Sequence, residues 1–229
     1  MCGRYAASAD PDRLVEEYRI DEVTDDGRQA CVPRFNIAPT DTVPAVVERA
    51  DGENMTRKLV GLRWGLVPSW SKDSGAAARM INARVETVVE KPAFRTAMAT
   101  RRCLLPALGY YEWRPEKEDG TTVKQPYFLH RLDDALVHMA GIYEFWKGPS
   151  GWLSTVSIIT TSATDELGWV HDRMPMTVVD RDAWLDPGSV DGASARELLV
   201  PLPGLLPTKV SRAVNSVAND GEHLVAPLA

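Results

Sequence analysis

The sequence has no apolar run that could cross a membrane, since none approaches the roughly 18 uninterrupted apolar residues that a spanning helix needs. Its first residues do not form a secretory signal either, because Arg4 and polar residues stand close behind Met1. The chain has only three cysteines, and none of them lies in a C-x-x-C pair. These absences predict a cytoplasmic protein that has no membrane partner and no structural disulfide.

Several common catalytic motifs are also missing. The sequence has no G-x-x-x-x-G-K-[ST] phosphate loop, no G-x-G-x-x-G loop, no H-E-x-x-H and no G-x-S-x-G elbow. No pairing of Cys and His has the spacing that is typical of a zinc site. We therefore expect no metal and no other cofactor.

Basic residues are in the minority, with 26 Lys and Arg against 32 Asp and Glu, which gives a net charge of −6. Nucleic-acid-binding domains are usually basic, so the overall charge argues mildly against such a partner. The arginines are unevenly spread, however, and several occur between residues 79 and 102. From the residues alone, a basic groove on an acidic protein stays an open alternative.

Short strands joined by tight turns dominate the hydrophobic pattern. Strands are predicted at 42–49, 56–66, 102–106, 109–114, 125–131, 135–146, 152–161, 176–179 and 209–214. Short helices are predicted at 11–19, at 86–99 with a break at Pro92, from a capping box at 162–165 to about 170, at 180–185 and at 193–199. Turns rather than helical crossovers join most strands, with signals at 51–52, 119–120, 133–134 and 148–151. We therefore predict an α+β fold with largely antiparallel sheets and peripheral helices.

The second residue is a cysteine whose α-amine would become free if Met1 were removed. Cys2 would then carry an amine and a thiol on adjacent carbons, with reference pKa values of about 7.7–8.0 and about 8.5. Such a 1,2-aminothiol can form a Schiff base with an aldehyde and then close a thiazolidine ring. The alternative, more common for a terminal residue, is an incidental cysteine in a frayed end of the chain.

Two further polar residues stand in surroundings that favour chemistry. Glu112 lies among aromatic residues, and desolvation there would raise its pKa and suit it to general acid–base work. The alternative is a glutamate on the solvent side of a strand. His171 lies in a charged turn, where functional residues often occur, although a single surface histidine is more common. A hydrolase with Cys2 as nucleophile and His171 as base also stays open.

Seven motifs follow one another along the chain and together carry a family resemblance. They are MCGRY at 1–5, RFNIAP at 34–39, RWGLVP at 63–68, INARVET at 81–87, GYYEW at 109–113, HDRMP at 171–175 and VSRAV at 210–214. In this order they closely resemble the SRAP family, the SOS-response-associated peptidases, also called abasic-site processing proteins. The resemblance spans essentially the whole chain and implies one α+β domain over residues 1–229 with a barrel-like antiparallel core.

The resemblance also implies a function. Family members bind single-stranded DNA, sense abasic sites and link the ring-opened sugar to the N-terminal cysteine through a thiazolidine, with autopeptidase removal of the initiator methionine. It implies four catalytic residues, which are the nucleophile Cys2, the site-stabilising amide of Asn82, the acid/base Glu112 and the sugar-positioning His171. It implies DNA contacts from Arg4, Pro39, Trp70, Arg84, Trp113 and Arg173. The protein would then associate with the nucleoid when bound to DNA, and a monomer would suffice.

Two other functions compete with this interpretation. One is a conventional peptidase that uses Cys2 and His171 on other proteins. The other is a module that binds single-stranded DNA without a covalent step. Both share residues with the first interpretation, and they differ from it in whether a covalent bond to DNA forms at Cys2.

Overall fold

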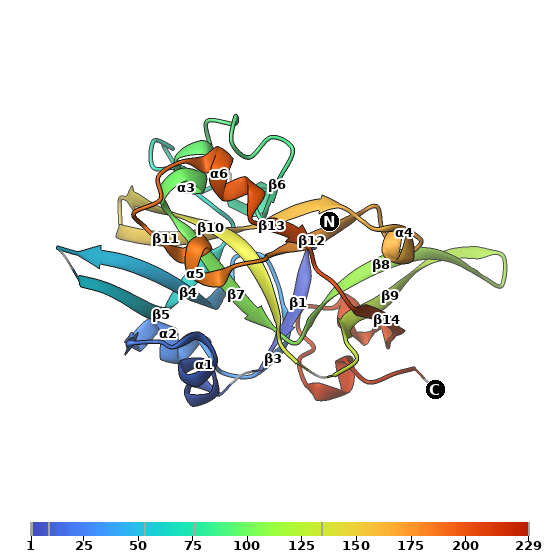
Figure 1. The fold of residues 1–229 in the computed structure, drawn as a ribbon. Coiled ribbons are helices and arrows are strands. Elements are labelled where there is room, and N and C mark those ends of the chain that lie inside the picture. Colours follow the sequence, from blue (N-terminus) through green and yellow to red (C-terminus); the bar gives the residue numbers. More distant parts are fainter. Residues whose placement is uncertain (1, 9, 53, 76, 134, 229) are drawn as a thin grey trace.

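The structure, a computed structural model, describes residues 2–8, 10–52, 54–75, 77–133 and 135–228. At its centre five strands close into a barrel (Figure 1). They are β4 (Thr42–Asp51), β5 (Asn54–Trp64), β7 (Arg102–Ala107), β10 (Val137–Gly148) and β11 (Gly151–Ser162). Neighbours in the barrel are antiparallel, except that β5 and β11 pair in parallel and so close the ring.

Four short strands extend the barrel at its rim. They are β2 (Glu22–Val23), β6 (Asn82–Arg84), β12 (Arg173–Val178) and β13 (Leu199–Pro201). Two of them matter for function, because β6 runs parallel to β11 and β12 runs antiparallel to it. The INARVET and HDRMP motifs, far apart in sequence, are therefore both attached to the same barrel strand.

A second antiparallel sheet lies beside the barrel. Its strands, in spatial order, are β14 (Leu205–Lys209), β9 (Thr121–Arg131), β8 (Gly109–Glu118), β1 (Arg4–Ala7) and β3 (Arg34–Ile37). The β8–β9 hairpin projects well beyond the rest of the molecule (Figure 1). Pairing between β1 and β8 runs only from Ala6 opposite Gly109 to Arg4 opposite Tyr111. Beyond Tyr111, β8 becomes an edge strand, and the N-terminal residues lie at the start of that edge.

Alternating side chains of the barrel strands belong to two hydrophobic clusters, as the pleat of a strand requires. In β4, for example, Ala45 and Val47 belong to one cluster and Val46 to the other. The first cluster fills the barrel and reaches the second sheet, where the ring of Tyr5 meets that of Trp64 edge-on at 5.2 Å between centroids. Cys2 also belongs to this cluster. Cys2 is thus anchored in the core.

The second cluster lies outside the barrel and is covered by short helices. These are α1 (Pro11–Tyr18), α3 (Arg95–Thr100), α5 (Arg181–Leu185) and α6 (Gly192–Glu197). Their starts follow from the sequence, because Asp10, Asp180 and Asp191 each accept hydrogen bonds from backbone N–H groups of the first turn. Two further helices are α2 (Asp25–Ala30) and α4 (Asp165–Gly168). No helix in the described part of the chain is both long and apolar enough to cross a membrane.

The predicted fold class is confirmed, together with the helix at 11–19, the hairpins and the helices after residues 180 and 191. Three details of the prediction are wrong. Residues 85–94 form turns, so only α3 remains of the helix predicted at 86–99. The segment predicted as a strand at 209–214 ends β14 and then forms a 3₁₀ turn at Arg212–Asn215. The helix α4 begins after Thr164, whose side chain makes no capping bond. Of the turn predicted at 133–134, Asp134 lies outside the described residues.

Candidate active site at the edge of β8

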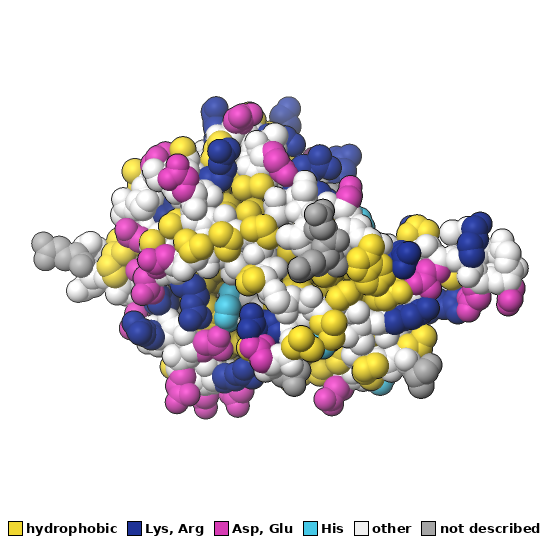
Figure 2. Space-filling view, turned by 45° about the vertical axis from the view of Figure 1, so that its right-hand side comes forward, with side chains coloured by type: hydrophobic (Ala, Val, Ile, Leu, Met, Phe, Trp, Pro, Cys, Tyr) yellow, Lys and Arg dark blue, Asp and Glu magenta, His cyan; other side chains and the backbone are white. Residues whose placement is uncertain are grey.

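A cleft of about 500 Å³ opens where β1 stops pairing with β8. Its lining combines charged, aromatic and amide side chains, which are Arg4, Glu112, Trp113, Pro115, Lys124, His171 and Asn215. Figure 2 shows basic, acidic and hydrophobic side chains mixed along the projecting hairpin on this side of the molecule. The cleft therefore offers positive charge and flat apolar surface together, although the chain as a whole is acidic.

Cys2 is fully buried and is not part of the cleft lining, although it lies close enough to Glu112, which lines the cleft, to be affected by its charge. Its backbone carbonyl accepts a hydrogen bond of 2.8 Å from Nδ2 of Asn82, and its thiol donates weakly to the carbonyl of Arg4 at 3.9 Å. Burial raises the pKa of the Cys2 thiol far above its usual value, and the nearby carboxylate of Glu112 raises it further. The thiol is therefore protonated at neutral pH. Met1, whose removal would free the Cys2 amine, lies outside the described residues.

Asn82 is held by two neighbouring elements. Its strand β6 pairs with β11, where Asn82 lies opposite Ile158, and the indole N–H of Trp64 donates to the preceding carbonyl of Ile81 at 3.0 Å. While Nδ2 bonds to Cys2, the buried Oδ1 of Asn82 accepts no hydrogen bond from the described residues. A buried acceptor without a donor is costly, so Oδ1 is ready to accept a hydrogen bond from a bound ligand.

Glu112 lies on β8 directly opposite Tyr127 and is only 3% exposed. Burial raises the pKa of its carboxyl from 4.5 to about 7, so both protonation states are populated near neutral pH. A carboxyl in this condition can donate and take up a proton during a reaction. The aromatic surroundings seen in the sequence thus correspond to real burial.

His171, the fourth predicted catalytic residue, lies in the turn before β12. Its Nε2 lies 3.8 Å from Oε2 of Glu112, and its Nδ1 accepts the backbone N–H of Arg173 at 3.0 Å. Burial lowers the pKa of His171, although the exposed carboxylate of Asp172 near Nδ1 opposes this effect. Nδ1 thus lies between the backbone N–H of Arg173 and Oδ1 of Asp172, the latter at 2.9 Å, while Nε2 faces Glu112.

Two predicted DNA contacts also lie in the cleft. Nη1 of Arg4 donates to Oδ1 of Asn36 at 2.7 Å and to the carbonyl of Val214 at 2.9 Å, and the guanidinium stands 6.0 Å from the ring of Trp113. The indole N–H of Trp113 donates to Oδ1 of Asn215 at 2.7 Å. Both side chains are thus held in defined orientations on one wall of the cleft.

A family model described as SOS response associated peptidase (SRAP) matches residues 1–217. The chain belongs to this family. The abasic site processing protein YoqW of Bacillus subtilis is 36% identical over 230 residues, which cover 98% of this chain and 99% of YoqW. The abasic site processing protein HMCES of Mus musculus is 32% identical over 85% of this chain and 65% of its own length.

Solved structures agree with the fold. A crystal structure of a protein from Bacteroides thetaiotaomicron matches all of both chains with a TM-score of 0.81 and 25% identity. A phage-related protein from Bordetella bronchiseptica matches 92% of this chain and 95% of its own, with a TM-score of 0.66 and 29% identity. The barrel and its accompanying sheet are therefore an architecture that relatives share.

The other predicted DNA contacts lie outside the lining of the cleft. Arg84 is exposed at the end of β6, two residues beyond Asn82, and Pro39 is half-buried in the turn after β3. Trp70 is 66% exposed in the loop after β5. Arg173 is only 9% exposed and forms a two-pronged ion pair with Glu86 at 2.5 and 3.0 Å. Its guanidinium is thus already engaged within the protein.

Sequence reasoning missed three residues that line the cleft, which are Pro115, Lys124 and Asn215. Lys124 lies opposite Pro115 in the β8–β9 hairpin, and the predicted strands at 109–114 and 125–131 were too short to show this pairing. Asn215 directly follows the VSRAV motif, and its role becomes visible only when that segment is seen beside Trp113. Among the described residues, no group of three or more His, Cys, Asp or Glu side chains could hold a metal ion.

Proposed function

We propose that this protein processes abasic sites in single-stranded DNA by linking the sugar aldehyde covalently to Cys2. The observation that carries the proposal is the convergence of Cys2, Asn82, Glu112 and His171, which come from four separate motifs. Asn82 contacts the backbone of Cys2, the charge of Glu112 acts on the Cys2 thiol, and His171 faces Glu112. The names of the YoqW and HMCES relatives support abasic-site processing as the biological role.

Removal of Met1 is the first step of the proposed sequence, because only then does Cys2 have a free amine. The family is named for a peptidase activity, and we assign that activity to this self-processing step. Met1 thus acts as a protecting group, and the chain becomes reactive toward aldehydes when it is lost.

The covalent reaction then needs an open aldehyde at C1′ of the abasic sugar. Glu112, protonated in a substantial fraction of molecules near pH 7, donates a proton to the ring oxygen and so promotes opening of the hemiacetal. The Cys2 amine attacks C1′, and loss of one water gives the imine. The sulfur adds to the same carbon while the thiol proton passes to the nitrogen. One water is released overall.

The order of these steps fits the state of the thiol. A buried, protonated thiol is a poor nucleophile, because the thiolate is the reactive form. The amine therefore makes the first bond, and the sulfur follows when the imine carbon is held next to it. His171 through Nε2 and Asn82 through Oδ1 would hold the sugar hydroxyl and the forming adduct.

The cleft also supports binding of a single strand. Arg4 and Lys124 provide charge for phosphates, with exposed Arg84 beyond Asn82, and Trp113 provides a ring for an unpaired base. Stacking of a base on an aromatic ring contributes about 1–3 kcal/mol, and a duplex would withhold that base. Binding through phosphates makes the affinity fall with salt.

The same geometry disfavours a conventional Cys–His peptidase. Such enzymes lower the pKa of the cysteine with a neighbouring imidazole, whereas here burial raises it and the thiol donates to the carbonyl of Arg4. A purely non-covalent DNA-binding module would need the basic cleft but not a cysteine amine beside a carboxyl with a raised pKa.

The test is to incubate the purified chain with a single-stranded oligonucleotide that carries one abasic site and to resolve the products on a denaturing gel without added reductant. We expect a slow-migrating covalent species that Cys2→Ala abolishes. The matched control is Cys31→Ala, which removes another buried free thiol and should leave the species intact. Retardation on native gels alone would identify a non-covalent module, and cleavage of a peptide panel without the species would identify a peptidase.

A further inference from the structure

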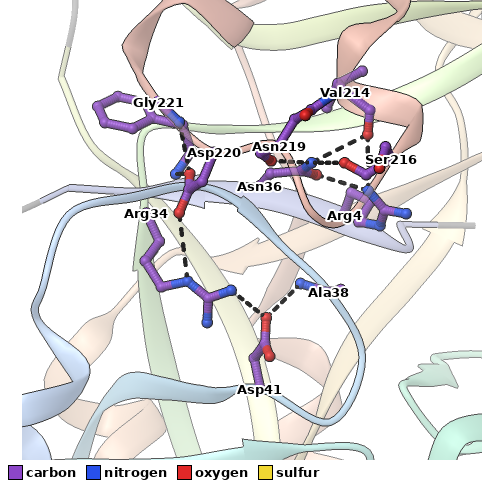
Figure 3. Close-up of polar contacts among 11 residues, drawn as sticks. Arg4, Arg34, Asn36, Ala38, Asp41, Val214, Ser216, Asn219, Asp220 and Gly221 are labelled. Atoms are coloured by element: carbon purple, nitrogen blue, oxygen red, sulfur yellow. Dashed lines mark hydrogen bonds and ion pairs between the residues drawn. The ribbon is translucent and has the colours of Figure 1, made fainter.

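Three of the seven sequence motifs have no part in the chemistry above, and the structure brings two of them together. The RFNIAP motif contains β3, and the VSRAV motif begins a segment of irregular structure at residues 211–220, which we call the C-terminal strap. Figure 3 shows the amide of Asn36 in β3 pointing at the strap and at the guanidinium of Arg4, which lies on the same side. The hydrogen bonds between these elements are concentrated on one side chain.

Asn36 is only 1% exposed, and both the nitrogen and the oxygen of its side-chain amide form hydrogen bonds. Nδ2 shares its two hydrogens among the carbonyls of Val214, Ser216 and Asn219, at 3.2, 2.9 and 2.8 Å. Oδ1 accepts from Nη1 of Arg4 at 2.7 Å. One buried side chain thus satisfies three carbonyls of a segment that has no sheet partner there and orients a cation of the cleft.

A second set of contacts, made by Asp220, holds the far end of the strap. One carboxylate oxygen of Asp220 accepts the backbone N–H of Phe35 at 2.6 Å, and the other lies 3.7 Å from Nε of Arg34. Arg34 in turn pairs with Asp41 at 2.7 Å, as Figure 3 shows. The strap is therefore tied to β3 at its middle and at its end.

The strap matters because it forms a wall of the cleft. The carbonyls of Val214 and Asn215 accept from Arg4 at 2.9 and 3.4 Å, and Oδ1 of Asn215 accepts from the indole N–H of Trp113. Arg4 and Trp113 are the cation and the aromatic ring that the proposed function assigns to DNA. If the strap moved, both would lose the partners that fix their orientation.

We propose that Asn36 is a positioning residue for DNA binding, which acts on the strand through Arg4, Trp113 and the strap without touching it. This proposal rests on the proposed function of the cleft. Asn36 contacts none of Cys2, Asn82, Glu112 and His171 in the described hydrogen bonds. Its loss should therefore weaken binding of the strand and leave the covalent step at saturating DNA nearly unchanged.

The experiment compares Asn36→Leu with the parent in single-turnover crosslinking over a range of abasic DNA concentrations and of salt. We expect the half-saturating DNA concentration to rise roughly tenfold or more, while the rate at saturation stays within about twofold. The slope of log affinity against log salt should fall by about 0.7 if Arg4 loses one phosphate. Arg4→Ala should reduce the slope by the same amount, and the double variant no further.

Two controls separate positioning from general loss of stability. Asp191→Ala removes the N-cap of α6, which packs in the other core cluster, and should leave both binding and rate unchanged. Asp220→Ala removes the contacts of Asp220 with Phe35 and Arg34. Because Asp220 is exposed, this variant is expected to fold even if Asn36→Leu does not. It should also weaken DNA binding, by several-fold. Amide hydrogen exchange of residues 211–220 should become faster in both strap variants.

The outcomes are distinct. Unchanged half-saturation in folded Asn36→Leu and Asp220→Ala, or equal losses in binding and saturated rate, would overturn the positioning role. Additive effects of Arg4→Ala and Asn36→Leu on the salt slope would also contradict it. If the parent forms no crosslink, the proposed function fails. Hydrogen exchange and the salt dependence of plain single-strand binding would still decide whether Asn36 holds the strap and Arg4.

Discussion

Replacing Glu112 by glutamine should stabilise the fold at alkaline pH while it slows the reaction at Cys2. The folded carboxyl has a pKa of about 7 against an ordinary 4.5, so the folded state holds a proton that the unfolded state has released between these values. The stability of the parent therefore falls as pH rises through this window. The difference of about 2.5 in pKa corresponds to about 3 kcal/mol, because one pKa unit is 1.36 kcal/mol.

The assay is urea unfolding of the parent and Glu112→Gln at pH 4.5 and pH 8. Glutamine does not titrate, so the variant should gain about 3 kcal/mol over the parent between the two pH values. Intact mass should accompany each sample, since a free Cys2 amine near Glu112 would lower its pKa and reduce the gain. The same variant should form the covalent species about 10²–10⁴-fold more slowly if Glu112 is the general acid.

A matched control lies on the same strand. Glu116 accepts hydrogen bonds from Lys209 and Tyr127, which lower the pKa of its carboxyl, so Glu116→Gln should lose rather than gain stability relative to the parent as pH rises. Equal stability changes for Glu112→Gln at the two pH values would refute a carboxyl with a raised pKa. An unchanged rate of crosslinking would remove Glu112 from the acid role.

Three further predictions test the walls of the cleft and its frame. Arg84→Ala should weaken single-strand binding and reduce the salt slope by about 0.7 while sparing the saturated crosslinking rate; an unchanged slope in a salt titration would exclude a phosphate contact. Trp113→Leu should weaken binding roughly 5- to 150-fold, measured by fluorescence anisotropy, because one stacked base is lost. Arg173→Met should lower the free energy of unfolding, measured in urea, by about 1–3 kcal/mol, because it breaks the hydrogen bond to the carbonyl of Thr160 and the ion pair with Glu86. Unchanged stability together with weaker DNA binding would instead support a phosphate contact.

The α+β class was predictable because the long hairpins carry strong local signals. Asp51-Gly52 and Asp119-Gly120 mark tight turns between β-branched or aromatic runs, and both hairpins form. Closure of the barrel was not derivable in this way. It depends on parallel pairing of β5 with β11, which are some 90 residues apart and meet only over Thr155–Arg63 and Val156–Trp64. The barrel-like core came from the family resemblance.

The wrong assignments have specific physical reasons. Residues 86–94 have helical composition, but Pro92 cannot be placed inside a helix, and a series of turns carries the chain from β6 to α3. The run at 209–214 contains two valines and resembles a short strand, yet Ser211 caps a 3₁₀ turn and the carbonyl of Val214 bonds to Asn36 instead of a sheet partner. Tertiary partners decide such short segments.

The candidate site shows the same division between local and distant information. Burial of Glu112 could be inferred from its aromatic neighbours, because that signal lies within five residues. The engagement of Arg173 by Glu86 could not, since it joins β12 to a turn 87 residues earlier in the chain. The resemblance named Arg173 as a DNA contact, and only the structure shows where its guanidinium is directed.

Covalent linkage at Cys2 is decided by the intact mass of the product formed with a single-stranded abasic oligonucleotide. We expect a single adduct that lacks Met1 and weighs the sum of the processed chain and the oligonucleotide less one water, with the modification mapped to Cys2. Borohydride treatment should leave the adduct mass unchanged, since a thiazolidine has no imine to reduce. An adduct on a lysine, an adduct that retains Met1, or a product that gains hydrogen from borohydride would exclude a thiazolidine at Cys2.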